Sequence, residues 1–360
     1  MHKIRMGIVG LGIMGRRYYA MLRALAGVEV TALCVRHLDT IDDLPGAKFS
    51  DYRMLFTSGQ VDAVIIATPH YSHPQVAIEA LHYGIHVLVD KPLAVHVADG
   101  RRMLAAHRDK TLRFGVMFQE RSQPFYVTIK SMIQGGVLGD IRRVHWIVTD
   151  WFRSQAYYQS SSWRATWKGE GGGLLINQCP HNLDLLQWFV GLPVRVTAHI
   201  ALGKYHPIEV EDEVNAFLEY PNGATGVFIA STGEAPGTNR LEIAGEKGKL
   251  VLEHGKLTLF ENAIETSVFS RTTPDLFARP PYQARDIAVH GEGEGHAGVL
   301  KNFRDAILDG VPLLTPAEEA LASLELGNAM LLSGLLHQPV DVPLDAACME
   351  RELLRLASVR

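Results

Sequence analysis

The sequence predicts an α/β Rossmann domain with a doubly wound parallel sheet, followed by an α+β domain with a large, open, mostly antiparallel sheet. At 360 residues the chain exceeds the usual size of one hydrophobic core. Its first 120 residues alternate short apolar runs with amphipathic stretches, and later short strand-like runs follow one another across turn signals. We therefore expect a dinucleotide-binding domain over residues 1–120, a substrate and oligomerisation domain over residues 121–295, and C-terminal helices over residues 296–360 that pack back on both.

Five apolar runs in the first domain have the length of buried strands. They are almost continuously apolar, as expected for parallel strands that are covered on both faces. These runs are residues 5–9, 28–35, 63–67, 86–89 and 113–117. Between them, apolar residues recur at helical spacing, which predicts βαβ units.

The second domain changes to a pattern of short alternating strands. We expect strands at residues 141–150, 195–200, 214–220, 224–230, 241–244, 249–253 and 256–260. Helices over residues 124–134 and 182–190 should cover one face of this sheet, and the other face could join subunits of a homodimer or homotetramer. Residues 262–294, with several prolines and glycines, are expected to be irregular. Helices over residues 299–309 and 316–336, the second capped by Thr315, should close the chain.

Composition and charge exclude several classes of function. A net charge of −4 gives no electrostatic footprint for nucleic acid or acidic membranes. The three cysteines, Cys34, Cys179 and Cys348, are far apart and show no metal-ligand spacing. The N-terminus enters a strand pattern at once, which predicts that there is no signal peptide. We expect a cytoplasmic protein without a metal site and without nucleic-acid or membrane partners.

A glycine motif follows the first apolar run and opens a helical pattern. Its glycines are Gly10, Gly12 and Gly15, with Ile13 and Met14 between the last two. Such glycines allow a tight turn and a close approach of the backbone to a pyrophosphate, which the N-terminus of the following helix then faces. In this βαβ context the motif predicts a dinucleotide site.

The second strand ends without the acidic residue that binds the ribose of NAD in many such sites. The chain has Val35-Arg36 there, and Asp39 comes later in the loop. Arg36 either pairs with the 2′-phosphate of NADP or points to solvent. The predicted cofactor is therefore NAD or NADP.

Two further strands end in polar segments, where an open parallel sheet places its ligands. One segment is Ala67-Thr68-Pro69, followed by Tyr71 and His73, and the other is Asp90-Lys91-Pro92. Far downstream, three glycines at residues 171–173 lead to Asn177, His181 and Asp184, which would lie near one face at the start of a helix.

Together, these segments resemble the Gfo/Idh/MocA oxidoreductases, a family named for glucose–fructose oxidoreductase, inositol dehydrogenase and a rhizopine-catabolism protein. The resemblance extends over nearly the whole chain. It implies that the glycine motif, residues 67–69, His73, Asp90 and Lys91 contact the cofactor. It also implies that Lys91 contacts substrate and nicotinamide, and that His181 is the general base.

The chain departs from the family pattern at two positions. Asp90 replaces the usual glutamate before the lysine, which is a mild change. Asn177 stands where inositol dehydrogenase-like members carry aspartate, four residues before the histidine. An amide cannot exchange a proton as a carboxylate does, so Asn177 is expected to hydrogen-bond a substrate hydroxyl instead.

An aromatic and basic segment between the two domains is the candidate substrate surface. Tyr157, Trp163 and Arg164 lie in it, and Tyr71 is a further candidate near the nicotinamide. Aromatic faces with nearby polar donors suit carbohydrate rings, although tryptophans in such a segment also cover cores and interfaces.

The predicted reaction is hydride transfer between NAD(P) and a secondary alcohol or ketone carbon of a sugar, glycoside or cyclitol. A histidine that titrates near neutrality suits removal of the hydroxyl proton, and a lysine next to the alcohol oxygen stabilises its negative charge. Two alternatives stay open: redox-assisted glycoside cleavage with tightly held NAD, and a catalytically silent ligand-sensing regulator of the same fold.

Overall fold

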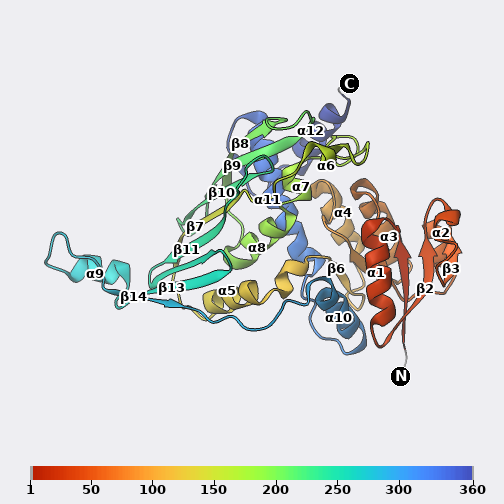
Figure 1. Cartoon of the computed structure of the whole chain (residues 1–360), viewed down its shortest axis with the longest axis horizontal. Coiled ribbons are helices and arrows are strands. Elements are labelled where there is room, and N and C mark those ends of the chain that lie inside the picture. The colour runs from red at the N-terminus through yellow and green to blue at the C-terminus, as the bar shows by residue number, and fades with distance from the viewer. Residues whose placement is uncertain (1–2, 359–360) are drawn as a thin grey trace.

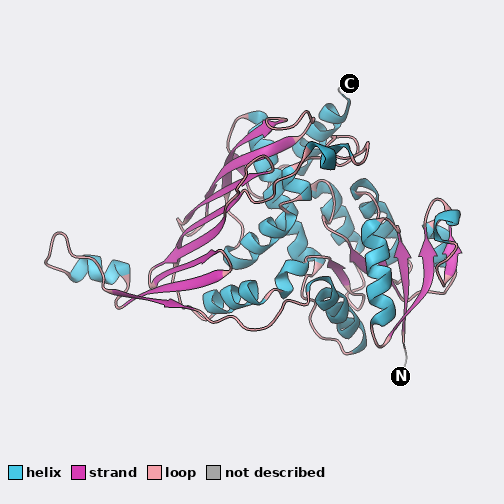
Figure 2. Ribbon diagram, viewed as in Figure 1, coloured by secondary structure: helices cyan, strands magenta, loops and turns pink. Residues whose placement is uncertain are grey.

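The computed structural model describes residues 3–358 and contains two sheets with helices between them (Figures 1 and 2). The first sheet has six parallel strands in the order β3-β2-β1-β4-β5-β6, which places the reversal of strand order between β1 and β4. Its strands are β1 (Ile4–Val9), β2 (Val28–Cys34), β3 (Ala47–Phe49), β4 (Ala63–Ile66), β5 (His86–Val89) and β6 (Phe114–Val116). Helices α1 (Ile13–Ala24), α2 (Tyr52–Thr57), α3 (His73–His82) and α4 (Val97–Ala106) alternate with them.

All five strands expected in this domain are confirmed within two residues at each end. Strand β3 and helix α2 were not expected, because the three residues of β3 are only partly buried at the sheet edge and carry no long apolar run.

The second sheet has nine strands in the order β14-β13-β12-β11-β7-β10-β9-β8-β15. Only β7 and β10 run parallel, so the prediction of an open, mostly antiparallel sheet is confirmed. The strands are β7 (Ile141–Val148), β8 (Arg195–Leu202), β9 (Glu211–Glu219), β10 (Thr225–Ser231), β11 (Asn239–Gly245), β12 (Gly248–Glu253), β13 (Lys256–Asn262), β14 (Tyr282–Asp286) and β15 (Val340–Asp341).

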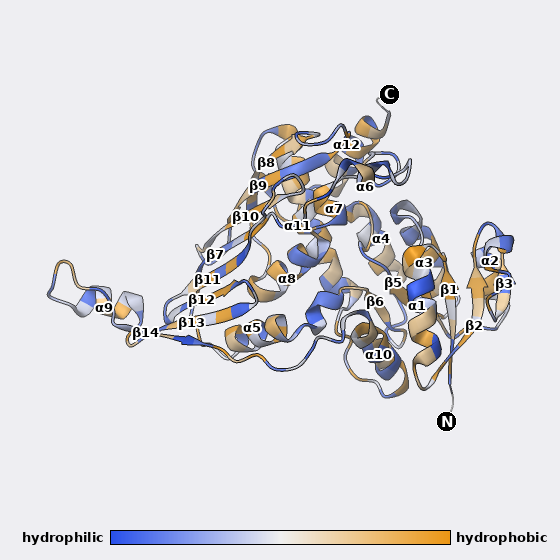
Figure 3. Cartoon of the chain, in the orientation of Figure 1, coloured by the Kyte–Doolittle hydropathy of each residue, from blue (hydrophilic) through white to orange (hydrophobic). Residues whose placement is uncertain are grey.

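Helices cover the face of this sheet that is turned toward the first domain, namely α5 (Pro124–Gln134), α8 (Pro180–Val190) and α11 (Ala317–Leu336) (Figure 1). Apolar and polar residues alternate along several of its strands (Figure 3), and the apolar ones meet the helices. Trp146 of β7, for example, is fully buried and stacks with Phe189 of α8 at 6.4 Å between ring centroids.

The C-terminal helices tie the two domains together. Helix α10 (Gly295–Leu308) joins the core of the first domain, where Val299 and Phe303 pack in one cluster with Ile4 and Tyr18. A third helix, α12 (Ala346–Ser358), was not expected and packs against α4 and α11. Its buried residues are Met349 and Leu353.

The expected cap of α11 is wrong. The helix begins at Ala317 after Pro316, and no side chain caps it. The hydroxyl of Thr315 donates instead to the carbonyl oxygen of Val116 at 2.5 Å, while the Val116 amide donates to the Thr315 carbonyl at 3.0 Å. Thr315 therefore extends the edge of the first sheet, which a local cap pattern cannot reveal.

The expectation of an irregular segment over residues 262–294 is also wrong in part. It contains helix α9 (Thr266–Thr272) and strand β14, which form an arm that projects from the sheet (Figure 1). Every residue of β14 is exposed at the sheet edge, and its side chains meet those of β13 on the surface, as in the ion pair between Asp286 and Lys256. It therefore lacks the alternation of apolar and polar residues that reveals a half-buried strand.

Among residues 3–358, no helix has the length and hydrophobicity needed to cross a membrane. In the same part of the chain, no three His, Cys, Asp or Glu side chains are grouped closely enough to hold a metal ion.

Candidate active site

The glycine motif forms a tight turn between β1 and α1. Gly10 has φ +92°, and a Cβ atom there would lie 2.5 Å from the carbonyl oxygen of Ala67. A Cβ at Gly15 would lie 2.0 Å from the Gly10 carbonyl oxygen, so packing requires glycine at both positions. A Cβ at Gly12 would meet nothing within 4 Å, and Ile13 is 88% exposed. The turn therefore keeps one side open in front of the N-terminus of α1, as dinucleotide binding requires. Met14, by contrast, is partly buried against the core.

The loop after β4 contains the predicted cofactor residues Ala67, Thr68 and Pro69. The Thr68 hydroxyl is buried without a hydrogen-bond partner, which fits a group that a ligand would satisfy. His73 is different, because it has no exposed surface and burial lowers its pKa. Its Nδ1 lies 2.9 Å from the Pro92 carbonyl oxygen and its Nε2 lies 2.8 Å from the Thr68 carbonyl oxygen. Both ring nitrogens thus lie beside backbone carbonyl oxygens of two loops, and a contact of His73 with the cofactor stays a prediction.

Arg36 at the end of β2 is exposed and forms no hydrogen bond or ion pair among the described residues. A contact of Arg36 with a 2′-phosphate stays a prediction.

Lys91 follows β5 and lies at the junction of the two domains. Its backbone amide donates to the Asp90 carboxylate at 2.9 Å, and the Tyr18 hydroxyl donates to the same oxygen at 2.9 Å. The ammonium group of Lys91 donates to the backbone carbonyl oxygen of Asn177 at 2.6 Å. Burial lowers the pKa of Lys91, and the negative charges of Asp90 and Glu170 act in the opposite direction. The lysine is therefore held near a buried site by a contact that spans the two domains.

His181 lies in the first turn of α8 and is 8% exposed. The Gln119 side-chain amide donates to its Nε2 at 3.1 Å, and its Nδ1 is buried without a partner. Burial lowers the pKa of His181 well below its ordinary value, and the charge of Lys91 adds to this effect. The imidazole is therefore neutral near pH 7, which is the form a general base requires.

Asp184 shares helix α8 with His181, as expected, but Asn177 does not. Asn177 ends a separate short helix, α7 (Leu174–Asn177). Its backbone carbonyl oxygen accepts from Lys91, and its side-chain oxygen accepts from Tyr157. Asp184 is fully buried and forms an ion pair with Arg121, with hydrogen bonds of 2.7 Å to Nε and Nη2. Asp184 therefore belongs to the core between the domains.

Glu170 is a buried carboxylate that the sequence reading missed. It is 2% exposed, and burial raises its pKa. One carboxylate oxygen accepts from the Asn177 side-chain amide, and the other accepts from the backbone amide of Ala165 at 2.7 Å. Glu170 is the only acid between Asp150 and Asp184, directly before three glycines, and that isolation is the signal that could have revealed it.

Glu211 holds the glycine segment in place from β9. Its carboxylate accepts from the backbone amides of Gly173 and Leu175, each at 3.0 Å. Burial raises the pKa of Glu211 to about 7. Because α7 begins at Leu174, this carboxylate fixes the start of the helix that carries Asn177.

The aromatic residues expected around the substrate meet at the same junction. The Tyr157 hydroxyl donates to the Asn177 side-chain oxygen at 3.5 Å and accepts from Arg164 Nη1 at 2.6 Å. The Tyr71 hydroxyl, from the first domain, donates to the Trp167 carbonyl oxygen at 2.8 Å. Trp163 is 38% exposed and lies at the outer edge of the group. The structure thus brings Lys91, Asn177, Tyr157 and Arg164 into one network.

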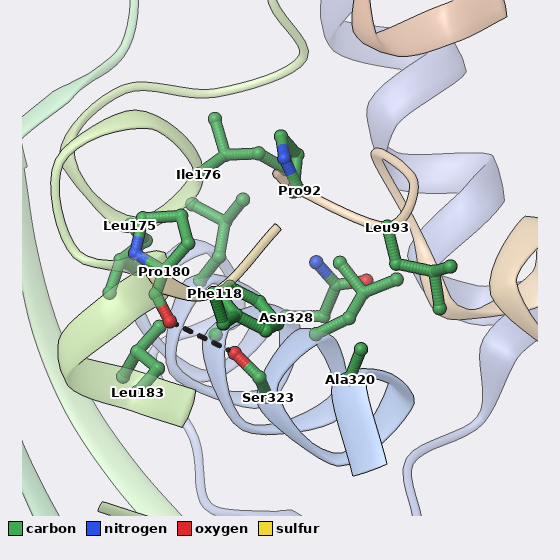
Figure 4. A pocket seen from close by; sticks show the side chains of 13 residues that line it. Pro92, Leu93, Phe118, Leu175, Ile176, Pro180, Leu183, Ala320, Ser323 and Asn328 are labelled. Carbon is green, nitrogen blue, oxygen red and sulfur yellow. Dashed lines mark hydrogen bonds between the residues drawn. The ribbon is translucent and has the colours of Figure 1, made fainter. Parts of the chain in front are cut away.

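A small apolar cavity lies behind this network (Figure 4). Its volume is about 20 Å³, too small for a sugar, and it is lined by Pro92, Phe118, Pro180 and residues of α7 and α11. Ser323 of α11 donates to the Pro180 carbonyl oxygen at 3.2 Å beside it. The cavity is packing space between the domains rather than a binding site.

Buried polar atoms without partners are concentrated at this junction. Within residues 3–358 there are six such side-chain atoms, and five of them belong to Thr68, Gln119, Arg153, Arg164 and His181. Native structures satisfy nearly all buried polar groups, so a cluster of unsatisfied ones indicates a site that ligands complete.

Known proteins match this chain over both domains. The family model for the oxidoreductase family with an NAD-binding Rossmann fold matches residues 4–118, and the model for the GFO/IDH/MocA C-terminal domain matches residues 126–251. The bovine (Bos taurus) trans-1,2-dihydrobenzene-1,2-diol dehydrogenase is 30% identical to it over 68% of this chain and 72% of its own length. The chain belongs to the GFO/IDH/MocA oxidoreductase family. This confirms the resemblance seen in the sequence and the NAD class of cofactor.

Two further relatives show the range within this family. The levoglucosan dehydrogenase of Pseudarthrobacter phenanthrenivorans is 24% identical over 95% of this chain and 99% of its own length. Among solved structures, the WlbA dehydrogenase from Bordetella pertussis, in complex with NADH and UDP-GlcNAcA, superposes with a TM-score of 0.79. It is 27% identical and covers 96% of this chain and 100% of its own.

Proposed function

We propose that this NAD-binding oxidoreductase transfers hydride between nicotinamide and a secondary alcohol or ketone carbon of a sugar, glycoside or cyclitol, with Lys91 and His181 as the acid/base pair. The observation that carries the proposal is the hydrogen bond from Lys91 to Asn177 across the two domains. The bond holds the Lys91 ammonium group against Asn177, which precedes His181 by four residues in the chain. Lys91 itself follows the carboxyl end of β5, where this fold binds its ligands. Relatives named levoglucosan dehydrogenase and inositol 2-dehydrogenase support a polyhydroxylated substrate.

The residues present fit a bound dinucleotide. Gly12 leaves open space beside the turn. The buried hydroxyl of Thr68 has no hydrogen-bond partner within the protein. Gly10, Gly12 and Ile13 would hold the pyrophosphate, and Thr68 and Lys91 would lie toward the nicotinamide. The nicotinamide, when bound, supplies the hydride acceptor or donor.

In the oxidative direction, the neutral His181 accepts the hydroxyl proton as hydride leaves the same carbon. Its lowered pKa keeps it unprotonated near pH 7. The Lys91 ammonium stabilises the developing negative charge on the substrate oxygen, and this effect is larger in a buried site than in water. The lowered pKa of Lys91 also allows it to share the proton transfer. In the reductive direction the same groups return the proton to the alkoxide.

A panel assay tests this proposal. Sugars, glycosides and inositols are supplied with NAD and separately with NADP, and nicotinamide absorbance is followed. We expect oxidation of at least one member with formation of reduced cofactor. Release of a sugar substituent without net reduction of NAD would instead indicate redox-assisted glycoside cleavage. Dinucleotide binding without any turnover would indicate a ligand-sensing regulator.

A further inference from the structure

Two arginines of the second domain, Arg153 and Arg164, lie against the ring of Tyr157. The guanidinium carbon of Arg164 lies 4.3 Å from the centroid of this ring, and that of Arg153 lies 5.1 Å from it. Arg153 also lies 5.2 Å from the Trp151 ring centroid, and Arg164 lies 4.9 Å from that of Trp163. Both cations thus contact the ring of Tyr157, and each also contacts a tryptophan ring.

In each arginine, Nη1 donates a hydrogen bond within the protein, whereas Nε has no partner. Nη1 of Arg164 donates to the Tyr157 hydroxyl at 2.6 Å, and Nη1 of Arg153 donates to the Phe152 carbonyl oxygen at 2.9 Å. Nε of both side chains is buried without a partner, and Nη2 of both forms no hydrogen bond within residues 3–358. The edge formed by Nε and Nη2 presents two parallel N–H groups, which is the geometry that binds a carboxylate through both oxygens.

The surrounding negative charge compensates these two cations only in part. Among residues 3–358, the only carboxylate within 4.0 Å of either guanidinium group is that of Glu170, which lies 3.9 Å from Nη1 of Arg164. Its two oxygens already accept from the Asn177 side chain and the Ala165 backbone. Within residues 3–358, Arg153 has no carboxylate within 4.0 Å, and a neutral sugar hydroxyl would satisfy its N–H groups but not its charge.

The free edges adjoin the proposed reaction site. The Tyr157 hydroxyl contacts Arg164 on one side and the Asn177 side chain on the other, and the Asn177 carbonyl oxygen holds the Lys91 ammonium. One small molecule can therefore reach both Lys91 and Arg164.

We propose that Arg153 and Arg164 form an anion-binding subsite, and that the substrate is a sugar that carries a carboxylate. This inference rests on the proposed function, because it assigns a substrate class to the same site. The planar carboxylate of a sugar acid fits the Nε–Nη2 edge of a guanidinium group. A phosphate ester of a sugar presents similar anion chemistry and is distinguished by the test.

The test compares sugars that differ only at one carbon. Initial rates are measured with glucose and glucuronate, with galactose and galacturonate, and with mannose and mannuronate, together with glucose 6-phosphate. We expect kcat/KM for at least one sugar acid to exceed that of its neutral partner about tenfold or more, as a hydrogen-bonded charge pair would supply. Equal kcat/KM within every pair overturns the inference. A preference for the phosphate ester over all sugar acids overturns the carboxylate assignment.

Variants of the two arginines locate the effect. In Arg164→Gln and Arg153→Gln we expect the ratio of kcat/KM for the sugar acid to kcat/KM for its neutral partner to fall about tenfold or more, through KM. Arg195→Gln, which removes an exposed arginine paired with Asp341, is the matched control and should leave this ratio unchanged. Equal losses on acid and neutral sugars in the two site variants contradict the inference.

A binding measurement separates failure of the subsite from failure of the proposed reaction. If no sugar is oxidised, the proposed function is wrong, but thermal stabilisation of the wild-type protein can still be measured with NADH present. Stabilisation by glucuronate that is absent in Arg164→Gln would support the subsite. Equal stabilisation by glucose and glucuronate, or by neither, would contradict it.

Discussion

The Lys91 ammonium group donates a hydrogen bond to the backbone carbonyl oxygen of Asn177, and this contact joins the parallel sheet to the second domain. A backbone carbonyl is available whatever side chain residue 177 carries. The replacement of the expected aspartate by Asn177 therefore does not remove the anchor of the lysine. The Asn177 side chain is turned instead toward Glu170 and Tyr157.

Two glycine substitutions separate cofactor binding from folding. Gly12→Ala adds a methyl group where the protein leaves open space, so we expect unchanged thermal stability but about tenfold or more weaker NADH binding. Gly10→Ala places a Cβ 2.5 Å from the Ala67 carbonyl oxygen at a φ of +92°, so it should lower stability by about 1–3 kcal/mol. Calorimetry and fluorescence titration with NADH measure both quantities. NADH binding that is unchanged in Gly12→Ala would place the pyrophosphate elsewhere.

Glu170 should influence the reaction through the pKa of Lys91. Its negative charge raises the pKa of Lys91, so Glu170→Gln should lower that pKa further and shift the lysine-dependent limb of the pH–rate profile to lower pH. NADH affinity should not change. Glu318→Gln, at an exposed carboxylate on α11, is the control and should leave the profile in place. A loss of rate in Glu170→Gln that is uniform across pH would contradict this role.

The pH dependence of oxidation should report the buried histidine. The pKa of His181 is lowered well below its ordinary value of 6.5, chiefly by burial. A general base works when it is unprotonated, so kcat/KM should stay level as pH falls through 6.5 and decline only at more acidic pH. The measurement is the acid limb of the pH profile with saturating NAD. A decline that begins above pH 6.5 would be inconsistent with the buried position of this base.

Glu211 should make stability fall between acid and neutral pH. Its pKa in the folded protein is about 7, above its ordinary value of 4.5. The folded state therefore retains a proton that the unfolded state has already lost, so this group's contribution to stability declines from about pH 4.5 to about pH 7 and is constant above. The total change is on the order of a few kcal/mol.

Glu211→Gln tests this effect, because the glutamine oxygen can still accept from Gly173 and Leu175. Thermal melts at pH 5 and pH 8 should show a smaller drop in Tm for this variant than for the wild-type protein. Asp341→Asn, at an exposed carboxylate, serves as control. An equal drop in all three proteins would show that Glu211 does not titrate in this range.

Sequence reasoning located the features that depend on local context. The glycines at 10, 12 and 15, Lys91 after an apolar strand and His181 at a helix start are each visible within a short window of sequence. Glu170 and Gln119 come from segments without such a pattern and meet the site only through folding. A loop position therefore could not distinguish them from solvent-exposed residues.

His73 shows that the partners of a predicted site residue cannot be read from sequence. It lies in the expected place beside the nicotinamide region, but the fold uses both ring nitrogens to join two loops. Strand β14 was missed because all of its side chains are exposed, so it lacks the alternation of apolar and polar residues that predicts a strand. Residue type predicts what a group can do, whereas its partners decide whether it is free to do it.

The most direct test of the proposed acid/base pair compares three variants on one accepted substrate. Lys91→Ala and His181→Ala should lower kcat by at least about a hundredfold, while NADH affinity changes little. Lys130→Ala is the matched control, because the Lys130 ammonium also donates to a backbone carbonyl oxygen, that of Trp188, at a different place. Its kcat should stay within about threefold of wild type. Full turnover in Lys91→Ala or His181→Ala would contradict the account.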